Sequence, residues 1–264
     1  MGEIITAAGP GGGPHIKVID SATGAVNAEF MAYDPSFTGG VFVASADFNR
    51  DGRDEIVTAA GAGGASHVKI FDGVTKQEIA SFFAYDPSFT GGVSIAAFDV
   101  NNDGTVDLVT GAGFGGGPEV RVFSGVDFSL IKSFFAYAID FTGGVFVAAG
   151  DLLSDGTYEI VTGAGVGGGA HVKVWDYDTL AIEDQFYAYN KFTLEDGQVI
   201  DQIFSGGVRV GIADTNNDGV NDLVTGAGPG GGPHVKVYTK GNSLDQLFSY
   251  FSGDPASPSG VFVA

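Results

Sequence analysis

Three nine-residue segments of the chain carry oxygen-bearing side chains at matching positions. "DFNRDGRDE" begins at Asp47, "DVNNDGTVD" at Asp99 and "DTNNDGVND" at Asp214, and each has acidic or amide residues at positions one, three, five and nine and glycine at position six. A hard cation such as calcium takes six to eight oxygen ligands, and glycine allows the loop to bend sharply around it. The seventh residues differ chemically, as expected where only a backbone carbonyl binds. The predicted calcium ligands are Asp47, Asn49, Asp51, Arg53 and Glu55; Asp99, Asn101, Asp103, Thr105 and Asp107; and Asp214, Asn216, Asp218, Val220 and Asp222.

Two other interpretations of these segments compete with a calcium loop between strands. An EF-hand needs a bidentate glutamate at position twelve and flanking helices, but that position holds Thr58, Thr110 and Thr225, and each segment runs straight into a strand-like sequence such as "EIVTAAG". A series of turns without an ion is the simpler alternative, because Asp, Asn and Gly favour turns. Three carboxylates converging in one short loop would repel each other without a cation, however, so we predict three calcium sites.

A fourth copy of the segment is degraded. "DLLSDGTYE" keeps Asp151, Asp155 and Glu159 but has Leu153 where an oxygen ligand belongs, so we expect weak or absent calcium binding there. Of a fifth copy, only Glu3 stands at the ninth position.

The segments belong to a repeat that runs through the chain. The sequence "GPHIKV" recurs five times in similar forms. Its histidine position is occupied by His15, His67, Glu119, His171 and His234, at intervals of 52, 52, 52 and 63 residues. Each repeat contains four short stretches rich in β-branched and aromatic residues, bounded by Gly, Pro, Asp or Asn, which is typical of strands. Four strands per repeat indicate a propeller blade.

The chain ends favour a closed ring. The N-terminal "EIITAAG" starts inside a repeat and provides three strands, while the C-terminal "GVFVA" provides the fourth. We therefore predict an all-β, five-bladed β-propeller of four-stranded blades, whose ring is closed by N- and C-terminal strands that share one blade. The single domain, 1–264, divides into repeats at about 4–55, 56–107, 108–159, 160–222 and 223–264. A piece of a longer repeat array is the alternative.

The combination of loop and strand resembles a known family. The pattern "DxNxDGxxD/E", followed by sequences such as "IVTGAG" and preceded by an aromatic and glycine-containing strand, is similar to the FG-GAP or VCBS repeats of integrin α-subunit propellers, and the resemblance covers essentially the whole chain. It implies that the loops hold calcium on one face of the propeller while ligands engage the opposite face. Integrin propellers contain more blades than the five repeats here, so their mode of ligand binding is not carried over.

Composition narrows the possible partners. The chain of 264 residues has a net charge of −20, which opposes binding to nucleic acid or to an anionic membrane. It has no cysteine, and no apolar run approaches the length of a membrane span. No signal peptide follows Met1, so we expect a soluble mature protein or a piece cut from a longer chain.

Two further sequence patterns resemble a nucleotide site and a metal or catalytic site, but we expect both to have structural roles. The segment 226–231 matches the dinucleotide pattern GxGxxG, but it leads into a strand and lacks the following helix, so a tight hairpin loop is expected. The four histidines occur once per repeat, which would spread them around a ring. We expect them to stabilise the fold, for example by hydrogen bonds to a neighbouring blade.

The remaining candidates are aromatic loops and one insertion. Tyrosine and phenylalanine residues in and around the "YDPSFTGG" loops could form a rim that stacks on sugars, although filling gaps between blades is the favoured interpretation. An insertion of 11 residues around "KFTLEDGQVIDQI" in the fourth repeat is where specificity would reside. The aromatic residues are Tyr33, Phe37, Tyr85, Phe89, Tyr137, Phe141 and Tyr189, and the acidic residues of the insertion are Glu195, Asp196 and Asp201.

The function predicted from these features is a calcium-stabilised binding or adhesion module without catalysis. We expect a monomer at the cell surface, outside the cell or in a periplasm, with a protein or glycan ligand and without nucleic-acid binding or membrane insertion. The alternative is a carbohydrate-binding propeller. An enzyme such as a polysaccharide lyase or phosphatase is less favoured, because no paired carboxylates or activated nucleophile depart from the repeat.

Overall fold

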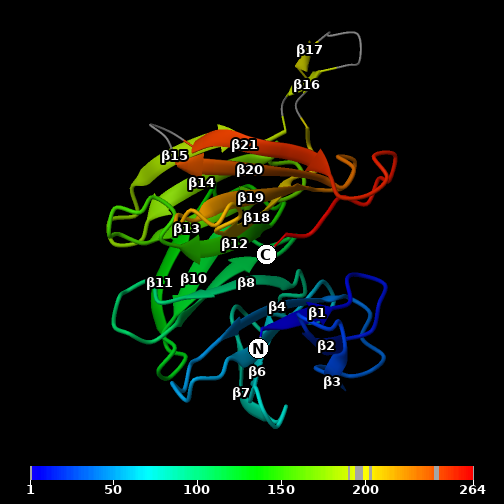
Figure 1. Cartoon of the computed structure of the whole chain (residues 1–264), viewed down its shortest axis with the longest axis vertical. Coiled ribbons are helices and arrows are strands. Elements are labelled where there is room, and N and C mark those ends of the chain that lie inside the picture. Colours follow the sequence, from blue (N-terminus) through cyan, green and yellow to red (C-terminus); the bar gives the residue numbers. More distant parts are fainter. Residues whose placement is uncertain (1, 190, 194–198, 202–203, 241–243, 264) are drawn as a thin grey trace.

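The chain folds as an all-β propeller. The computed structural model describes residues 2–189, 191–193, 199–201, 204–240 and 244–263. Within this part of the chain all regular structure is β, and five antiparallel sheets are arranged as five blades (Figure 1). The predicted fold class and blade number are therefore confirmed. The described residues contain no helix that could cross a membrane.

The strands form one three-stranded blade, four four-stranded blades and a separate pair. Blade 1 contains β1 (Glu3–Ala7), β2 (His15–Asp20) and β3 (Val26–Met31), and blade 2 contains β4 (Val41–Ala46), β5 (Glu55–Ala60), β6 (His67–Phe71) and β7 (Glu78–Phe83). Blade 3 contains β8 (Val93–Phe98), β9 (Asp107–Ala112), β10 (Glu119–Phe123) and β11 (Leu130–Phe135). Blade 4 contains β12 (Val145–Gly150), β13 (Glu159–Ala164), β14 (His171–Asp176) and β15 (Ile182–Tyr187). Blade 5 contains β18 (Val208–Ala213), β19 (Asp222–Ala227), β20 (His234–Lys240) and β21 (Leu244–Phe251), and β16 (Lys191–Thr193) pairs with β17 (Val199–Asp201).

Burial follows the order of the strands within a blade. The first strands of neighbouring blades pack together around the centre, β4 beside β8, β8 beside β12 and β12 beside β18. Every residue of the second strands β5, β9 and β13 is buried, whereas the outermost strands β7, β11 and β15 alternate between exposed and half-buried residues. A predicted repeat such as 56–107 therefore holds the outer strands of one blade and the inner strand of the next.

Tyrosines in the loops after the outer strands join adjacent blades. The hydroxyl of Tyr85 donates to the carbonyls of Thr110, at 3.1 Å, and Glu119, at 2.9 Å, both in the next blade. Tyr33, Tyr137 and Tyr189 make the same pair of contacts with their own neighbouring blades. The prediction that these rings fill gaps between blades is confirmed. The alternative aromatic rim is wrong for the tyrosines, because Tyr85 and Tyr189 are buried and their hydroxyls are engaged by backbone.

The repeated glycines let two backbones touch within a blade, where the inner strand begins and the second strand ends. Gly113, after β9, donates its N–H to the carbonyl of Gly92, before β8, at 2.9 Å, and a Cβ at Gly113 would lie 2.1 Å from the oxygen of Gly91. Equivalent contacts recur in blades 2, 4 and 5, where Gly61, Gly165 and Gly228 approach the loop that precedes the inner strand of their own blade. The glycine-rich segment 226–231 leads into β20, as expected of a hairpin loop and not of a dinucleotide site.

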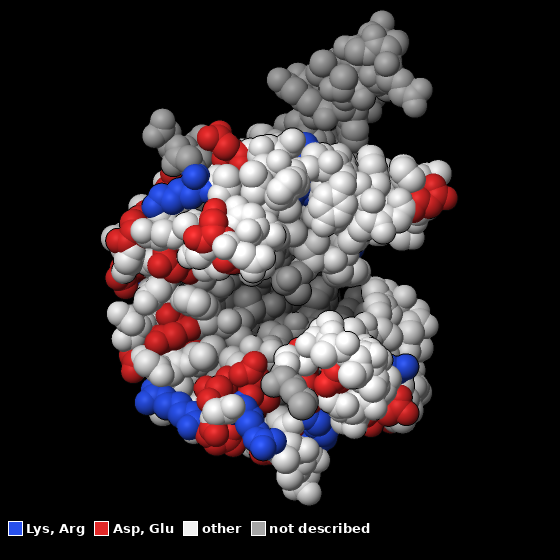
Figure 2. Space-filling model, in the orientation of Figure 1, with Lys and Arg blue, Asp and Glu red and all other residues white. Residues whose placement is uncertain are grey.

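The two chain ends meet at blade 1 without strand pairing. Residues 260–263 lie where an inner strand belongs, since the N–H of Val261 donates to the carbonyl of Ala227 at 3.0 Å. Within the described residues, however, this segment is not paired with β1, and β1 remains exposed, with Ile4 51% accessible. Figure 2 shows a hollow between the part that carries β1–β3 and the part that carries β18–β21. The predicted sharing of blade 1 is thus seen in the placement of the C-terminal segment and not in hydrogen bonding.

Candidate metal sites

Four acidic loops follow the inner strands of blades 2 to 5. We call 47–55, 99–107, 151–159 and 214–222 the first, second, third and fourth acidic loops. All four have one backbone shape, with positive φ at the fourth residue and at the glycine in sixth position. This left-handed conformation is costly for residues with a side chain, but Asn and Gly tolerate it. The fourth residues are Arg50 (62°), Asn102 (56°), Ser154 (48°) and Asn217 (59°), and the glycines are Gly52 (85°), Gly104 (85°), Gly156 (89°) and Gly219 (86°).

The side chains at positions one, three and five turn inward on the loop. In the second loop, Asp99 accepts the backbone N–H groups of Asp103, at 3.1 Å, and Gly104, at 2.8 Å. Asn101 also accepts from the N–H of Asp103, and Asp103 accepts from the N–H of Thr105 at 2.8 Å. The first and fourth loops repeat all four bonds. Because each carboxylate oxygen has a further lone pair, these bonds orient the oxygens and leave capacity for a cation.

The ninth residue of each loop is a buried carboxylate at the start of a strand. Asp107 and Asp222 are fully buried, and in the part of the chain that the structure describes Oδ2 of Asp107 and Oδ1 of Asp222 have no hydrogen-bond partner. Glu55, one methylene longer, instead accepts the N–H of Phe48 at 3.0 Å and the side-chain amide of Asn49 at 2.9 Å. A buried oxygen with no donor is costly unless a cation completes it. The orphaned oxygens of the second and fourth loops therefore fit a hard metal ion.

The electrostatics of the loops also fit a missing positive charge. Burial raises the pKa of Asp107 to about 6, and the nearby charges of Asp103 and Asp99 add to this effect. Burial likewise raises the pKa of Glu55, with a contribution from Asp51. A divalent cation within the loop would reverse both effects, because it favours the charged carboxylate.

The side chains are not gathered into a complete metal cage. Among the residues that the structure describes, no group of three or more His, Cys, Asp or Glu side chains is arranged to hold a metal ion. The carboxylates instead face the N–H donors of their own loops. The sites assigned to Asp47, Asp99 and Asp214 and their partners, with the carbonyls of Arg53, Thr105 and Val220, thus stay predictions, supported by loop shape and donor chemistry.

The third loop differs at its third and ninth positions, although Oδ1 of its first residue, Asp151, is also buried without a partner among the described residues. Leu153 packs against the hydrophobic core instead of offering an oxygen. Glu159 accepts the N–H groups of Leu152, at 2.7 Å, and Leu153, at 3.0 Å, and the hydroxyl of Thr157 at 3.1 Å. Its carboxylate is therefore better satisfied than that of Asp107, although burial raises its pKa to about 6. The expectation of weak binding at this loop remains a prediction.

Neighbouring acidic loops touch one another on one face of the propeller. The side chain of Arg50 in the first loop donates to the hydroxyl of Thr105 in the second. The hydroxyl of Tyr158 donates to Asn102 at 3.4 Å, and the side chain of Asn221 donates to the carbonyl of Asp151 at 3.0 Å. Each acidic loop therefore contacts the next one along the chain.

The histidines are structural, but not in the way expected. His234 stacks on Phe251, with ring centroids 4.5 Å apart, and its Nε2 lies 2.8 Å from the hydroxyl of Ser249 in the same blade. The expected hydrogen bond from an imidazole to a neighbouring blade is therefore wrong for His234. The cation two residues later makes that bond instead, since Lys236 donates to the carbonyl of Ala188 at 2.8 Å.

Sequence reasoning missed residues that lie at the centre and on the outer rim. Arg209 of β18 lines the central cavity and is buried. Its signal was a single charge inside an otherwise apolar inner strand. Exposed aromatic rings end the outer strands of four blades, but only their burial distinguishes them from the other aromatic residues. These rings are Phe83, Phe135, Tyr187 and Phe251.

The insertion of the fourth repeat contains the pair β16–β17. Glu195 and Asp196 lie outside the described residues, and Asp201 ends β17.

Comparisons with known proteins agree with this architecture. Residues 47–110, which hold the first acidic loop, the outer strands of blade 2 and the whole second acidic loop, match the FG-GAP-like repeat family. No curated protein matches the chain. A crystal structure of a protein of unknown function from Bacteroides caccae is similar, with a TM-score of 0.57 and 10% identity, over 96% of this chain and 74% of the other. The RRP9 WD40 repeats superpose with a TM-score of 0.52 and 17% identity, over 94% and 76%. Residues 47–110 of this five-bladed propeller thus form an FG-GAP-like repeat.

Proposed function

We propose that the protein is a calcium-stabilised binding module without catalysis. The observation that carries the calcium assignment is the pair of buried, unpartnered oxygens, Asp107 Oδ2 and Asp222 Oδ1, at the base of two loops of identical shape. Side-chain oxygens at positions one, three and five of the same loops complete a set of hard donors that suits calcium.

Calcium would act chiefly on stability. Each loop connects the inner strand of a blade to the second strand, so an ion bound there fixes that turn and relieves the repulsion between its carboxylates. Loops of this open kind suit the weak, millimolar-range affinities of extracellular modules. We therefore propose a location outside the cell, at its surface or in a periplasm, and a role in adhesion or ligand binding on a monomeric propeller.

Counting bound calcium tests the assignment. We expect three calcium ions per chain by calorimetry, and two each for Asp103→Asn and Asp218→Asn. Asp155→Asn, in the loop interrupted by Leu153, is the matched control and should leave the count unchanged. A wild-type protein that binds no calcium at millimolar concentration and melts at the same temperature in chelator and in calcium would refute the proposal.

A carbohydrate-binding propeller is the second candidate, for a reason different from the buried tyrosines. The exposed rings at the ends of the outer strands recur in four blades, and Phe83, Tyr187 and Phe251 are each stacked on a histidine of the adjacent strand. Aromatic faces held in this way can stack on sugar rings, and several weak sites would act together by avidity. Phe83→Ser and Tyr187→Ser should lower binding to a glycan array. A signal unchanged in the double variant would exclude these rings.

A further inference from the structure

The inner strands enclose a cavity at the centre of the propeller. Two adjoining spaces, of about 340 and about 480 Å³, share Phe42, Phe146, Arg209 and Phe262 as lining residues. The rest of the wall is mainly apolar side chains of the inner strands and the backbone of the glycine loops. Spaces of this size and polarity are typical of sites for small molecules, which usually combine an apolar lining with a few polar groups.

Arg209 is the one charged residue among five equivalent positions on the cavity wall. The second residue of each inner strand, including the C-terminal segment, is Phe42, Ser94, Phe146, Arg209 or Phe262. Ser94 donates its hydroxyl to the carbonyl of Val145 in the next blade at 2.7 Å. Arg209 uses Nη1 in the same way, towards the carbonyl of Val261 at 3.0 Å. The hydrogen bond to the next blade is thus made by an uncharged serine in blade 3, so this bond does not require the charge of Arg209.

Among the described residues, the rest of the guanidinium has no acceptor. Nη1 donates to the carbonyls of Val261 and Ala227, but Nε is buried without a partner, and the described residues form no ion pair with Arg209. Nη2 therefore remains able to donate a charge-assisted hydrogen bond to a carboxylate. Burial lowers the pKa of Arg209 to about 10, so the side chain is still a cation at neutral pH. A buried, unpaired cation is costly, and an anion would offset that cost.

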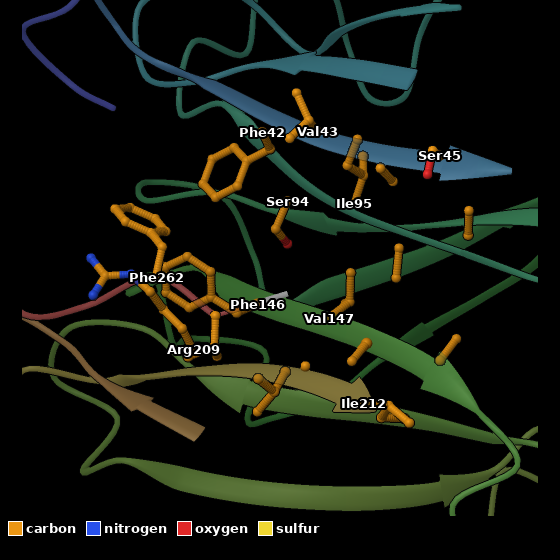
Figure 3. A pocket seen from close by; sticks show the side chains of 18 of the residues that line it. Phe42, Val43, Ser45, Ser94, Ile95, Phe146, Val147, Arg209, Ile212 and Phe262 are labelled. Atoms are coloured by element: carbon orange, nitrogen blue, oxygen red, sulfur yellow. The ribbon is translucent and has the colours of Figure 1, made fainter. Parts of the chain in front are cut away.

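Aromatic rings stand beside this cation. The guanidinium carbon lies 3.8 Å from the ring centroid of Phe262 and 5.5 Å from that of Phe146. The ring of Phe42 is 5.9 Å from Phe262 and 6.3 Å from Phe146, measured between centroids. Figure 3 shows the three rings and Arg209 converging at one end of the cavity from β4, β12, β18 and the C-terminal segment. The cavity therefore presents a cluster of aromatic rings beside one positive group.

We propose that the central cavity binds a small aromatic carboxylate, with the carboxylate on Nη2 of Arg209 and the aromatic body in the cavity against Phe42, Phe146 and Phe262. The chain carries a net charge of −20, so general electrostatic attraction of an anion is not expected and binding must come from this local cation. The site lies in the cavity and not on the acidic loops, and it does not depend on whether these loops bind calcium.

Benzoate is a suitable probe, with benzamide as its neutral counterpart of the same shape. By NMR titration we expect saturable binding of benzoate to the wild-type protein, at least about tenfold weaker binding of benzamide, and still weaker binding of inorganic phosphate, which lacks the ring. Arg209→Ser, chosen because Ser94 makes the equivalent hydrogen bond in blade 3, should lower benzoate affinity by at least about tenfold. Arg121→Ser is the matched control and should not change it, because that arginine is paired with Glu119 away from the cavity.

A second measurement covers the case in which Arg209→Ser does not fold. Intermolecular NOEs in the wild-type protein should connect the benzoate ring protons with the rings of Phe42, Phe146 and Phe262. Absence of saturable binding to folded wild-type protein, equal affinity for benzamide, or NOEs only to residues outside the cavity would each overturn the proposal. Repeating the titration in chelator separates it from the calcium proposal.

Discussion

We predict that the buried carboxylate of Asp107 makes the stability of the protein depend on calcium, and that Asp107→Asn reverses this dependence for the second acidic loop. Asp107 is inaccessible to solvent, Oδ1 accepts the N–H of Gly125 at 3.2 Å, and Oδ2 has no partner. Its pKa is raised from the ordinary value of 3.8 to about 6. Each pKa unit corresponds to about 1.36 kcal/mol, so the charged form costs the calcium-free folded state at most about 3 kcal/mol at pH 7.5.

Asp107→Asn removes this cost and removes a calcium ligand. Without calcium at pH 7.5, we expect the variant to unfold at a higher temperature than the wild type, by at most roughly 6 to 12 °C for a domain of this size. Calcium at a hundredfold excess over Kd adds about 2.7 kcal/mol per site to the wild type, and the variant should lack one such increment. In chelator the variant should therefore be more stable than the wild type, and in calcium this difference in stability should become smaller or change sign.

Differential scanning calorimetry in chelator and in calcium measures both effects. Asp127→Asn is a control outside the acidic loops and should respond to calcium as the wild type does. The pH dependence has a defined sign, because a raised pKa in the folded state means that calcium-free stability falls as the pH rises from about 4 to about 6. Destabilisation of Asp107→Asn in chelator would refute the electrostatic reasoning. An undiminished calcium response would refute the assignment of Asp107 as a ligand.

Three further predictions concern a contact between blades, a close approach of backbones within a blade, and a histidine. Tyr85→Phe removes the hydroxyl that bridges the carbonyls of Thr110 and Glu119, so it should cost about 1 kcal/mol in urea unfolding, and an unchanged midpoint would contradict the bridging role. Gly113→Ala should destabilise the protein by at least about 2 kcal/mol, because its Cβ would lie 2.1 Å from the carbonyl oxygen of Gly91. Gly9→Ala, at the equivalent position of blade 1, should be tolerated, since nothing lies within 4 Å of the added Cβ. Equal losses of stability in the two variants would show that blade 1 is covered in solution. Burial lowers the pKa of His234 to about 4, so the unfolded chain binds a proton at this residue at a higher pH than the folded chain does. The stability that neutral His234 contributes is therefore lost as the pH falls from about 6.5 towards 4. His234→Gln should remove this pH-dependent loss, as measured by urea unfolding at several pH values.

Much of the fold was accessible to sequence reasoning because its signals are local. The 52-residue period marks successive blades, and the short apolar stretches bounded by glycine and aspartate became strands such as β5 and β9. The acidic loops were equally readable, since a positive φ at Asn102 and Gly104 and inward side chains follow from the residue types of one nine-residue segment.

Burial and contacts of individual side chains could not be predicted from the sequence, because the same local sequence pattern occurs in different tertiary environments. Tyr85 is buried since its loop is covered by the next blade, whose contacting residues Thr110 and Glu119 lie 25 and 34 positions away. Arg209 faces the central cavity because β18 is an inner strand, and its lack of an acidic partner depends on four other strands. The chain by itself determined the number of blades and the order and turns of their strands through periodicity and turn chemistry. Only the assembled ring decided which side chains are covered, which carboxylates lack donors and how closely the C-terminal segment approaches β1, since these depend on contacts between residues far apart in the sequence.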